Sequence, residues 1–175
     1  MRQHLAMIVI NLALALFPAT AQAEIALPTE AADPILTIIV PDQTYVLDRD
    51  ALTSLPAQSF TTSTIWTEGP QEFTGLAMAD LLAILTNLDE TLTMDRLNAA
   101  SFTLIAANGY QIEVPIAHYS ERTALIAYAR NGQPMTLRDK GPLWIVYPFD
   151  TDPMYRSEVI YANSIWQLEQ IVFTE

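Results

Sequence analysis

Two Asn-Gly dipeptides, at residues 108–109 and 131–132, constrain the fold of this chain more than any other feature. Asparagine and glycine best tolerate the positive φ angles of a two-residue type I′ turn, which joins antiparallel strands. Strand-like arms flank the first pair in SFTLIAANGYQIEVPI, and ALIAYARNGQPM repeats the pattern around the second. The pattern predicts two β-hairpins, in the first of which Ile112, Val114 and Ile116 face inward.

Other segments add strands to this picture. ILTIIV and PLWIVYP are apolar runs that predict buried strands, and we expect the second to lie in the middle of a sheet. SFTTSTIW and SIWQLEQIVF predict two more strands, whereas DRDALTSLP predicts a short helical turn that Pro56 ends. The glycines fall between these strands or at the entrance of a helix, and none has the spacing of a phosphate-binding loop.

One segment predicts a clear helix, from residue 76 to about residue 87. Its apolar side chains recur at i, i+3, i+4 and i+7, at Met78, Leu81, Leu82 and Leu85. With one or two short helices besides, the chain is predicted to be α+β, mostly mixed sheet with one clear amphipathic helix.

The N-terminal residues predict export. Arg2 precedes an apolar run over residues 5–17, and Ala21-Gln22-Ala23 offers small residues at both positions that signal peptidase reads. We expect residues 1–23 to be a cleaved signal peptide, residues 24–34 a flexible segment, and residues 35–175 a single periplasmic domain. The alternative is an uncleaved membrane anchor, for which the run is short against the span of about 20 residues that a bilayer requires.

The charge of the chain excludes several classes of partner. It contains 20 Asp and Glu against 8 Lys and Arg, and an acidic protein repels nucleic-acid phosphates and anionic membranes. It contains no cysteine, so it has neither a disulfide nor a thiolate ligand or nucleophile. Against this acidic background, residues 129–148 gather three of the few cations: Arg130, Arg138 and Lys140.

Catalytic motifs are sparse. Beyond the predicted signal peptide His118 is the one histidine, which excludes a His-rich zinc site. A Ser-His-Asp triad needs one histidine, but no GxSxG motif accompanies it. Asp150 and Asp152 could bind a hard cation, although the glycine turn of a calcium loop is missing and a solvated acidic loop is the alternative. We therefore assign no catalytic and no metal-binding residue.

A set of aromatic and hydrogen-bonding residues near turns favours a flat heteroaromatic ligand, because rings stack on its faces and polar groups match its edges. The set is Trp66, Glu68, Asn108, Tyr110, Arg130, Arg138, Asp139, Lys140, Tyr147, Arg156 and Trp166. Taken singly, several members also suit a purely structural role. Tyr147 and Trp166 lie in apolar runs typical of a core, Asn108 suits its turn, and Asp139 with Lys140 suits a solvated charge pair.

Five segments in order, FTGLAMADLL, AANGYQIEVP, ARNGQPM, GPLWIVYP and SIWQLEQIVF, resemble the molybdopterin-binding domain of the sulfite oxidase family over residues 35–173. The resemblance is greatest to a branch of small, exported, single-domain proteins. That branch is described as molybdopterin-dependent oxidoreductases, and some members are periplasmic pterin-binding proteins that work with a membrane-bound cyclic-di-GMP enzyme. The resemblance implies a molybdopterin-binding fold of the sulfite oxidase type.

The chain departs from the enzymes of that family in two places. In the enzymes a cysteine after an early strand binds molybdenum, but here TSTIWTEGPQEF contains none. The basic run that follows their last core strand is replaced by acidic FDTDPM. A cofactor that carries phosphate and molybdenum would lose its thiolate and much of its charge compensation. The resemblance thus implies a pterin, in reduced form, rather than the molybdenum cofactor.

By this resemblance the pterin cleft comprises Trp66, Glu68, Arg130, Asp139, Lys140, Tyr147 and Arg156. Trp66 is expected to stack on the ring, and Glu68 or Asp139 to accept hydrogen bonds from the aminopyrimidine edge. The predicted function is a non-catalytic periplasmic pterin-binding module that signals to the periplasmic domain of an inner-membrane protein of the cyclic-di-GMP type. The alternatives are a molybdopterin-dependent oxidoreductase without the cysteine ligand, and an interaction or assembly protein whose fold has lost ligand binding.

Overall fold

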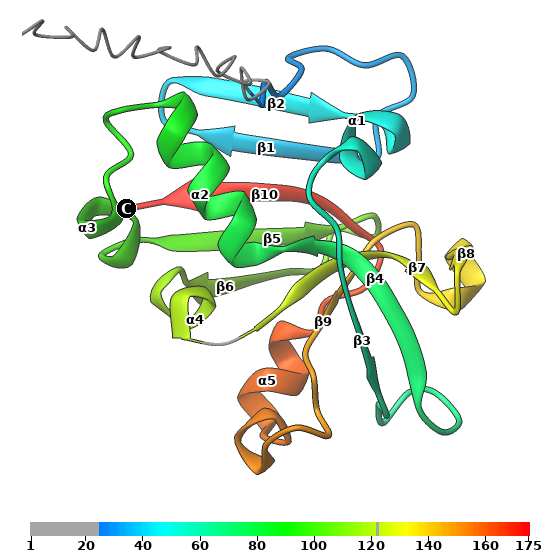
Figure 1. Ribbon diagram of the computed structural model, residues 1–175. Coiled ribbons are helices and arrows are strands. Elements are labelled where there is room, and N and C mark those ends of the chain that lie inside the picture. Colours follow the sequence, from blue (N-terminus) through cyan, green and yellow to red (C-terminus); the bar gives the residue numbers. More distant parts are fainter. Residues whose placement is uncertain (1–24, 122) are drawn as a thin grey trace, which may run out of the picture.

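The fold consists of two β-sheets with one long helix and several short ones packed on them (Figure 1). The computed structural model describes residues 25–121 and 123–175, so the predicted signal peptide, residues 1–23, lies outside the described part. No helix among the described residues is long and apolar enough to cross a membrane. The mixture of sheets and helices confirms the predicted α+β class.

Five strands form the first sheet. In spatial order they are β2 (Gln43–Leu47), β1 (Leu36–Val40), β10 (Leu168–Thr174), β5 (Ser101–Ala106) and β6 (Gln111–Pro115). β10 pairs in parallel with β1 and antiparallel with β5, so the sheet is mixed, as predicted. The C-terminal segment therefore supplies the central strand of this sheet.

The second sheet is antiparallel. Its strands are β3 (Gln58–Thr62), β4 (Gln71–Ala77), β7 (Leu125–Arg130) and β8 (Gln133–Pro134), and β9 (Trp144–Val146) also pairs with β7. β4 and β7 approach closely at Gly75, where a Cβ atom would lie 2.2 Å from the carbonyl oxygen of Ile126. Gly75 thus lies inside a strand, at a register shift after Thr74, and not between strands or at the helix entrance as predicted.

The predicted amphipathic helix is α2 (Met78–Leu88), and all four residues of its predicted stripe are buried. Figure 1 shows α2 lying across the first sheet. DRDALTSLP forms a short helix, as predicted, but there are more short helices than expected. They are α1 (Arg49–Ser54), α3 (Met94–Asn98), α4 (Ala117–Glu121) and α5 (Glu158–Asn163), with two 3₁₀ turns, η1 (Leu137–Asp139) and η2 (Pro153–Tyr155). Helices this short contain too few turns to display an apolar period.

Both predicted hairpins are present, but their turns differ. Asn131 and Gly132 have φ angles of 51° and 72°, so β7 and β8 are joined by the predicted two-residue turn. In the β5–β6 hairpin only Gly109 has a positive φ, 80°, so its turn is not type I′. Asn108 instead accepts a hydrogen bond from the Tyr110 amide at its Oδ1 atom, 3.0 Å away, which stabilises a longer turn.

Two predicted strands are shorter than expected. SFTTSTIW ends as a strand at Thr62, because the next amide, that of Ser63, donates to the Asp150 carboxylate. PLWIVYP is buried as predicted, but it forms only the short strand β9, which lies at the edge of the second sheet and not in its middle. Its open side is covered by the chain that precedes β10, where the Ile145 amide donates to the Ile165 carbonyl over 2.9 Å.

Residues 25–34 contain no helix or strand, yet they are attached to the domain. The Leu27 side chain is buried in the core, and the Val46 amide donates to the Pro28 carbonyl over 2.8 Å. The part of this segment around Pro28 therefore lies beside β2.

Candidate functional site

A cavity of about 300 Å³, here called the aromatic pocket, lies between three parts of the chain. The loop after β3 contributes Trp66, and the β5–β6 hairpin contributes Ala106, Asn108 and Tyr110. The segment from α5 to β10 completes the lining with Tyr161, Ala162, Ser164, Ile165 and Trp166. These described lining residues include four aromatic rings and no charged side chain, which suits a small, flat, uncharged ligand.

Trp66 is held in place by aromatic contacts. Its ring centroid lies 5.5 Å from that of Trp166, 5.8 Å from those of Trp144 and Tyr161, and 6.3 Å from that of Phe149. All four pairs are edge-on, the arrangement that the quadrupoles of aromatic rings favour. The half-buried Trp66 side chain is therefore fixed as one wall of the pocket.

Trp166 forms another wall, placed by the tight turn at Gln167, whose φ is 53°. The Ala107 amide donates to the Gln167 carbonyl over 2.9 Å, which attaches this wall to the β5–β6 hairpin. The Lys140 Nζ atom lies 4.2 Å from the Trp166 ring centroid and 5.8 Å from that of Trp144. Lys140 thus contacts a wall of the pocket through cation–π interactions without lining the pocket itself.

Asn108 supplies the amide group of the pocket. Its Oδ1 atom accepts from the Tyr110 amide, and its Nδ2 atom donates to no other described residue. The Nδ2 hydrogens are therefore available to a ligand carbonyl, and Oδ1 retains a second lone pair. Tyr110 is 53% exposed, so its ring lies at the opening of the pocket.

The predicted residues Arg130 and Asp139 form an ion pair outside the pocket lining. Their Nη2 and Oδ1 atoms lie 3.0 Å apart, and the Thr136 hydroxyl donates to Asp139 Oδ2 over 2.8 Å. The hydrogen bond from Thr136, and then the nearby Arg130 guanidinium, lower the pKa of Asp139. Both carboxylate oxygens already accept one hydrogen bond each, so Asp139 is engaged with its own neighbours.

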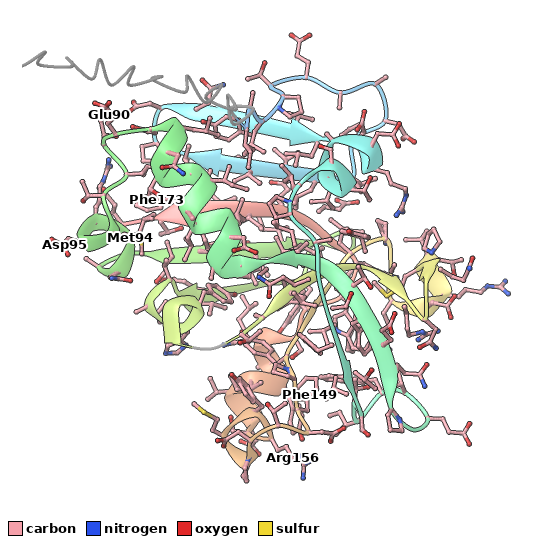
Figure 2. All side chains as sticks on the ribbon, viewed as in Figure 1. Glu90, Met94, Asp95, Phe149, Arg156 and Phe173 are labelled. Atoms are coloured by element: carbon pink, nitrogen blue, oxygen red, sulfur yellow. The ribbon has the colours of Figure 1, made fainter. Side chains whose placement is uncertain are left out.

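Arg156 also pairs with an acid. Its Nη2 atom lies 3.0 Å from Asp150 Oδ1, and its Nε atom donates to the Phe149 carbonyl over 2.8 Å. Figure 2 shows Phe149 and Arg156 in the lower part of the molecule, beside α5. Asp152, the other acid of the suggested cation loop, accepts from the Met154 amide at the start of η2, which agrees with the alternative of a capped, solvated loop.

Tyr147 belongs to the core. Its side chain is fully buried, with its ring 6.1 Å from Tyr155 and 6.3 Å from Phe149. Burial, and then the Tyr147 hydroxyl, raise the pKa of the neighbouring Tyr119. A place in the core, which its apolar run favours, therefore describes Tyr147 better than a place in the cleft.

Of the seven residues predicted to bind the ligand, the structure brings Trp66 into the pocket and Lys140 against its wall. Glu68 is exposed on the loop after β3 and does not line the pocket. Asn108, Tyr110 and Trp166 belonged to the wider aromatic and polar set, and the pocket brings them together with Trp66. Tyr161 was missed because it lies in α5, a six-residue helix that no sequence pattern marks as part of a site. Ile165 was missed because it lies in SIWQLEQIVF, which was interpreted only as a strand.

Neither a metal site nor a catalytic triad is seen among the described side chains. No group of three or more His, Asp or Glu side chains there is arranged to hold a metal ion. His118 lies in α4, and its buried Nδ1 atom has no hydrogen-bond partner among the described residues. Among the described side chains, which do not include those of residues 120–122, no acid therefore binds Nδ1 to orient this imidazole as a triad requires.

No family model and no curated protein matches the chain. Among solved structures, the sulfane dehydrogenase SoxCD from Paracoccus pantotrophus matches with a TM-score of 0.55 and 14% sequence identity. The match covers 79% of this chain and 37% of that chain, so the chain spans well under half the length of its structural neighbour. The chain has a sulfite oxidase-type fold. This likeness confirms the predicted fold, and it concerns the fold alone.

The side chains present do not fit the complete molybdenum cofactor that this fold type implies. The sequence provides no thiolate for the metal. A phosphate needs cations, yet Arg130 and Arg156 are each paired with an aspartate, and no cation of the described residues lines the aromatic pocket. The aromatic walls and the Asn108 amide do fit an uncharged heteroaromatic ring.

Proposed function

We propose that the protein is a non-catalytic pterin-binding module whose ligand lies in the aromatic pocket. The observation that carries this proposal is the combination of Trp66, Trp166 and Tyr161 around a cavity of about 300 Å³ without a charged residue in its described lining. Such a cavity lies at the lower end of the volumes of ligand pockets, roughly 300–1,000 Å³. It favours a bicyclic ring over a cofactor with a long charged substituent.

Asn108 takes the role predicted for Glu68 or Asp139. A pterin edge offers a ring carbonyl and amino hydrogens, and a side-chain amide can donate to the first and accept from the second. The Nδ2 atom of Asn108 is available for this purpose, whereas Asp139 is bound to Arg130 and Thr136 and does not line the pocket. We place the ring against the tryptophan walls of the pocket, with one edge toward Asn108.

The charge arrangement supports an uncharged ligand. Lys140 lies on Trp166, and the guanidinium groups of Arg130 and Arg156 are balanced by carboxylates. A phosphate at Arg130 or Arg156 would have to compete with the aspartate that each guanidinium already binds. On this proposal, the chain gathers cations in residues 129–148 without building a phosphate site.

We further propose that the module acts in the periplasm and signals its ligand state to the periplasmic domain of an inner-membrane signalling protein of the cyclic-di-GMP type. This part rests on the signal-peptide pattern of residues 1–23 and on the family resemblance. Signalling requires that the partner bind the ligand-bound and free forms with different affinities. Recovery of the partner from solubilised membranes by the purified protein, with and without a reduced pterin, tests it; equal recovery contradicts signalling.

The alternative function is a molybdopterin-dependent oxidoreductase that lacks the cysteine ligand, which the sulfite oxidase-type fold favours. Metal content separates it from the binding module, because the enzyme must retain molybdenum. An interaction protein that has lost ligand binding would purify without a pterin and bind none on titration.

A further inference from the structure

The Asp150 carboxylate joins the loop that carries Trp66 to the chain that leads to α5. We call residues 63–70, between β3 and β4, the Trp66 loop. The Ser63 amide, at its start, donates to Asp150 Oδ2 over 2.5 Å, and the Asp150 amide donates to the hydroxyl of the buried Thr62 over 3.1 Å. The Arg156 guanidinium binds the other carboxylate oxygen, Oδ1, over 3.0 Å. Asp150 therefore connects the end of β3 with the chain that leads to α5.

The start of the Trp66 loop lies between two cavities. The aromatic pocket touches Trp66, and a second cavity of about 270 Å³ is lined by Ser63, Thr64, Ile65, Phe149, Asp150, Arg156 and Tyr161. Ile65 is 62% exposed, so the loop buries little there besides the Trp66 ring. A segment with few other buried contacts opens at low cost unless specific contacts hold it. Here these are the edge-on contacts of the Trp66 ring and the hydrogen bond from Ser63 to Asp150.

The remaining hydrogen bonds of this part of the loop are local. The Thr64 and Thr67 hydroxyls lie 2.8 Å apart, and the Trp66 amide donates to Thr64 Oγ1 over 3.0 Å. These bonds shape the loop but do not attach it to the rest of the protein. The bond from Ser63 to Asp150 does, and hydrogen bonds to a charged group are stronger than neutral ones.

We propose that Asp150 is a positioning residue for the ligand site: its carboxylate fixes the start of the Trp66 loop and thereby controls how fast ligand leaves the aromatic pocket. The link to ligand release rests on the proposed function, whereas the positioning of Trp66 can be measured without ligand. Arg156 acts through Asp150, because it orients the carboxylate toward Ser63.

The test compares Asp150→Asn with Glu175→Gln. The control breaks another surface ion pair, between Arg96 and Glu175, whose side-chain atoms lie 2.6 Å apart and which does not line either cavity. The protein contains three tryptophans, so 5-fluorotryptophan labelling gives a simple ¹⁹F spectrum, in which Trp66→Phe identifies the Trp66 signal. Pterin release is followed by stopped-flow fluorescence, with pterin itself as the probe.

We expect Asp150→Asn to shift or broaden the Trp66 signal of the ligand-free protein and to raise the pterin dissociation rate about tenfold, with a smaller change in association rate. Glu175→Gln should change neither the Trp66 signal nor the dissociation rate. Asp150→Glu, which keeps the charge, should change both less than Asp150→Asn does. A Trp66 signal or a dissociation rate equal to that of the wild type overturns the proposal. If the Trp66 signal moves but the wild type binds no pterin, the proposed function fails while the positioning of Trp66 stands.

Discussion

The Lys140 ammonium lies 4.2 Å from the centroid of the Trp166 ring, so a cation of this acidic chain rests on a wall of the aromatic pocket. The same wall meets Trp66 edge-on at 5.5 Å. The two contacts link the cation-rich segment around η1 to the loop after β3, although about 70 residues separate them. Lys140 can therefore affect the pocket without touching a ligand.

Replacing Lys140 by methionine tests this indirect role. The change keeps a long side chain and removes the charge, and a cation–π contact at a partly exposed site contributes about 0.5–1 kcal/mol. We expect a slightly lower free energy of unfolding and a pterin affinity lowered by a few-fold, measured by urea unfolding and by fluorescence titration. A loss of affinity as large as that of a Trp66 variant would show that Lys140 contacts the ligand directly.

Replacing Trp66 by alanine removes the stacking wall. Stacking of an aromatic side chain on a planar base contributes about 1–3 kcal/mol, so we expect the Kd for pterin to rise at least about fivefold. Trp66→Phe, which retains a smaller ring, should fall between the alanine variant and the wild type. Circular dichroism is the control for folding; a folded alanine variant with unchanged Kd would contradict the placement of the ligand.

Tyr147→Phe distinguishes the core from the cleft. The Tyr147 hydroxyl is buried near Tyr119, so its removal should lower the free energy of unfolding by about 1 kcal/mol. Because Tyr147 does not line the aromatic pocket, we expect the Kd for pterin to stay unchanged. Urea unfolding and pterin titration on the same preparation measure both. Weaker pterin binding with an unchanged free energy of unfolding would show that Tyr147 contacts the ligand.

The lowered pKa of Asp139 predicts that the stability of the protein depends on pH. Its pKa is lowered by the Thr136 hydroxyl and by Arg130, so the folded state favours the charged carboxylate. The resulting stabilisation is present above the ordinary pKa of an aspartate and is lost as the pH falls through the lowered value. The difference in Tm between wild type and Asp139→Asn should therefore shrink between neutral pH and about pH 3. If the difference in Tm stays constant over this pH range, the charge of Asp139 is not what stabilises the wild type.

The sequence correctly predicted those elements of the fold that depend on the residues of one short segment. The apolar stripe of α2 and the Asn131-Gly132 turn follow from periodicity and from backbone preference, and both are present. The Asn108-Gly109 turn shows the limit, because the same dipeptide also suits a longer turn in which the asparagine side chain bonds to Tyr110. Local pattern cannot choose between the two.

The site was harder to predict because distant residues complete it. Ser63 ends its strand early by bonding to a carboxylate 87 residues away, which no local pattern reveals. Tyr147 and Trp66 are both aromatic residues near polar ones, yet one is in the core and the other lines the pocket. Arg130 and Asp139 suited a ligand site in the sequence, but in the structure they bind each other.

On the proposed function, the aromatic pocket binds a pterin without molybdenum. Purified protein, residues 24–175, prepared from the periplasm of a pterin-producing host, should be denatured and its extract assayed for both pterin fluorescence and molybdenum. We predict released pterin, or binding of an added reduced pterin with a stoichiometry near one if the ligand is lost on purification, and no molybdenum. Stoichiometric molybdenum in the extract, or a folded protein that neither carries nor binds a pterin, would contradict the proposed function.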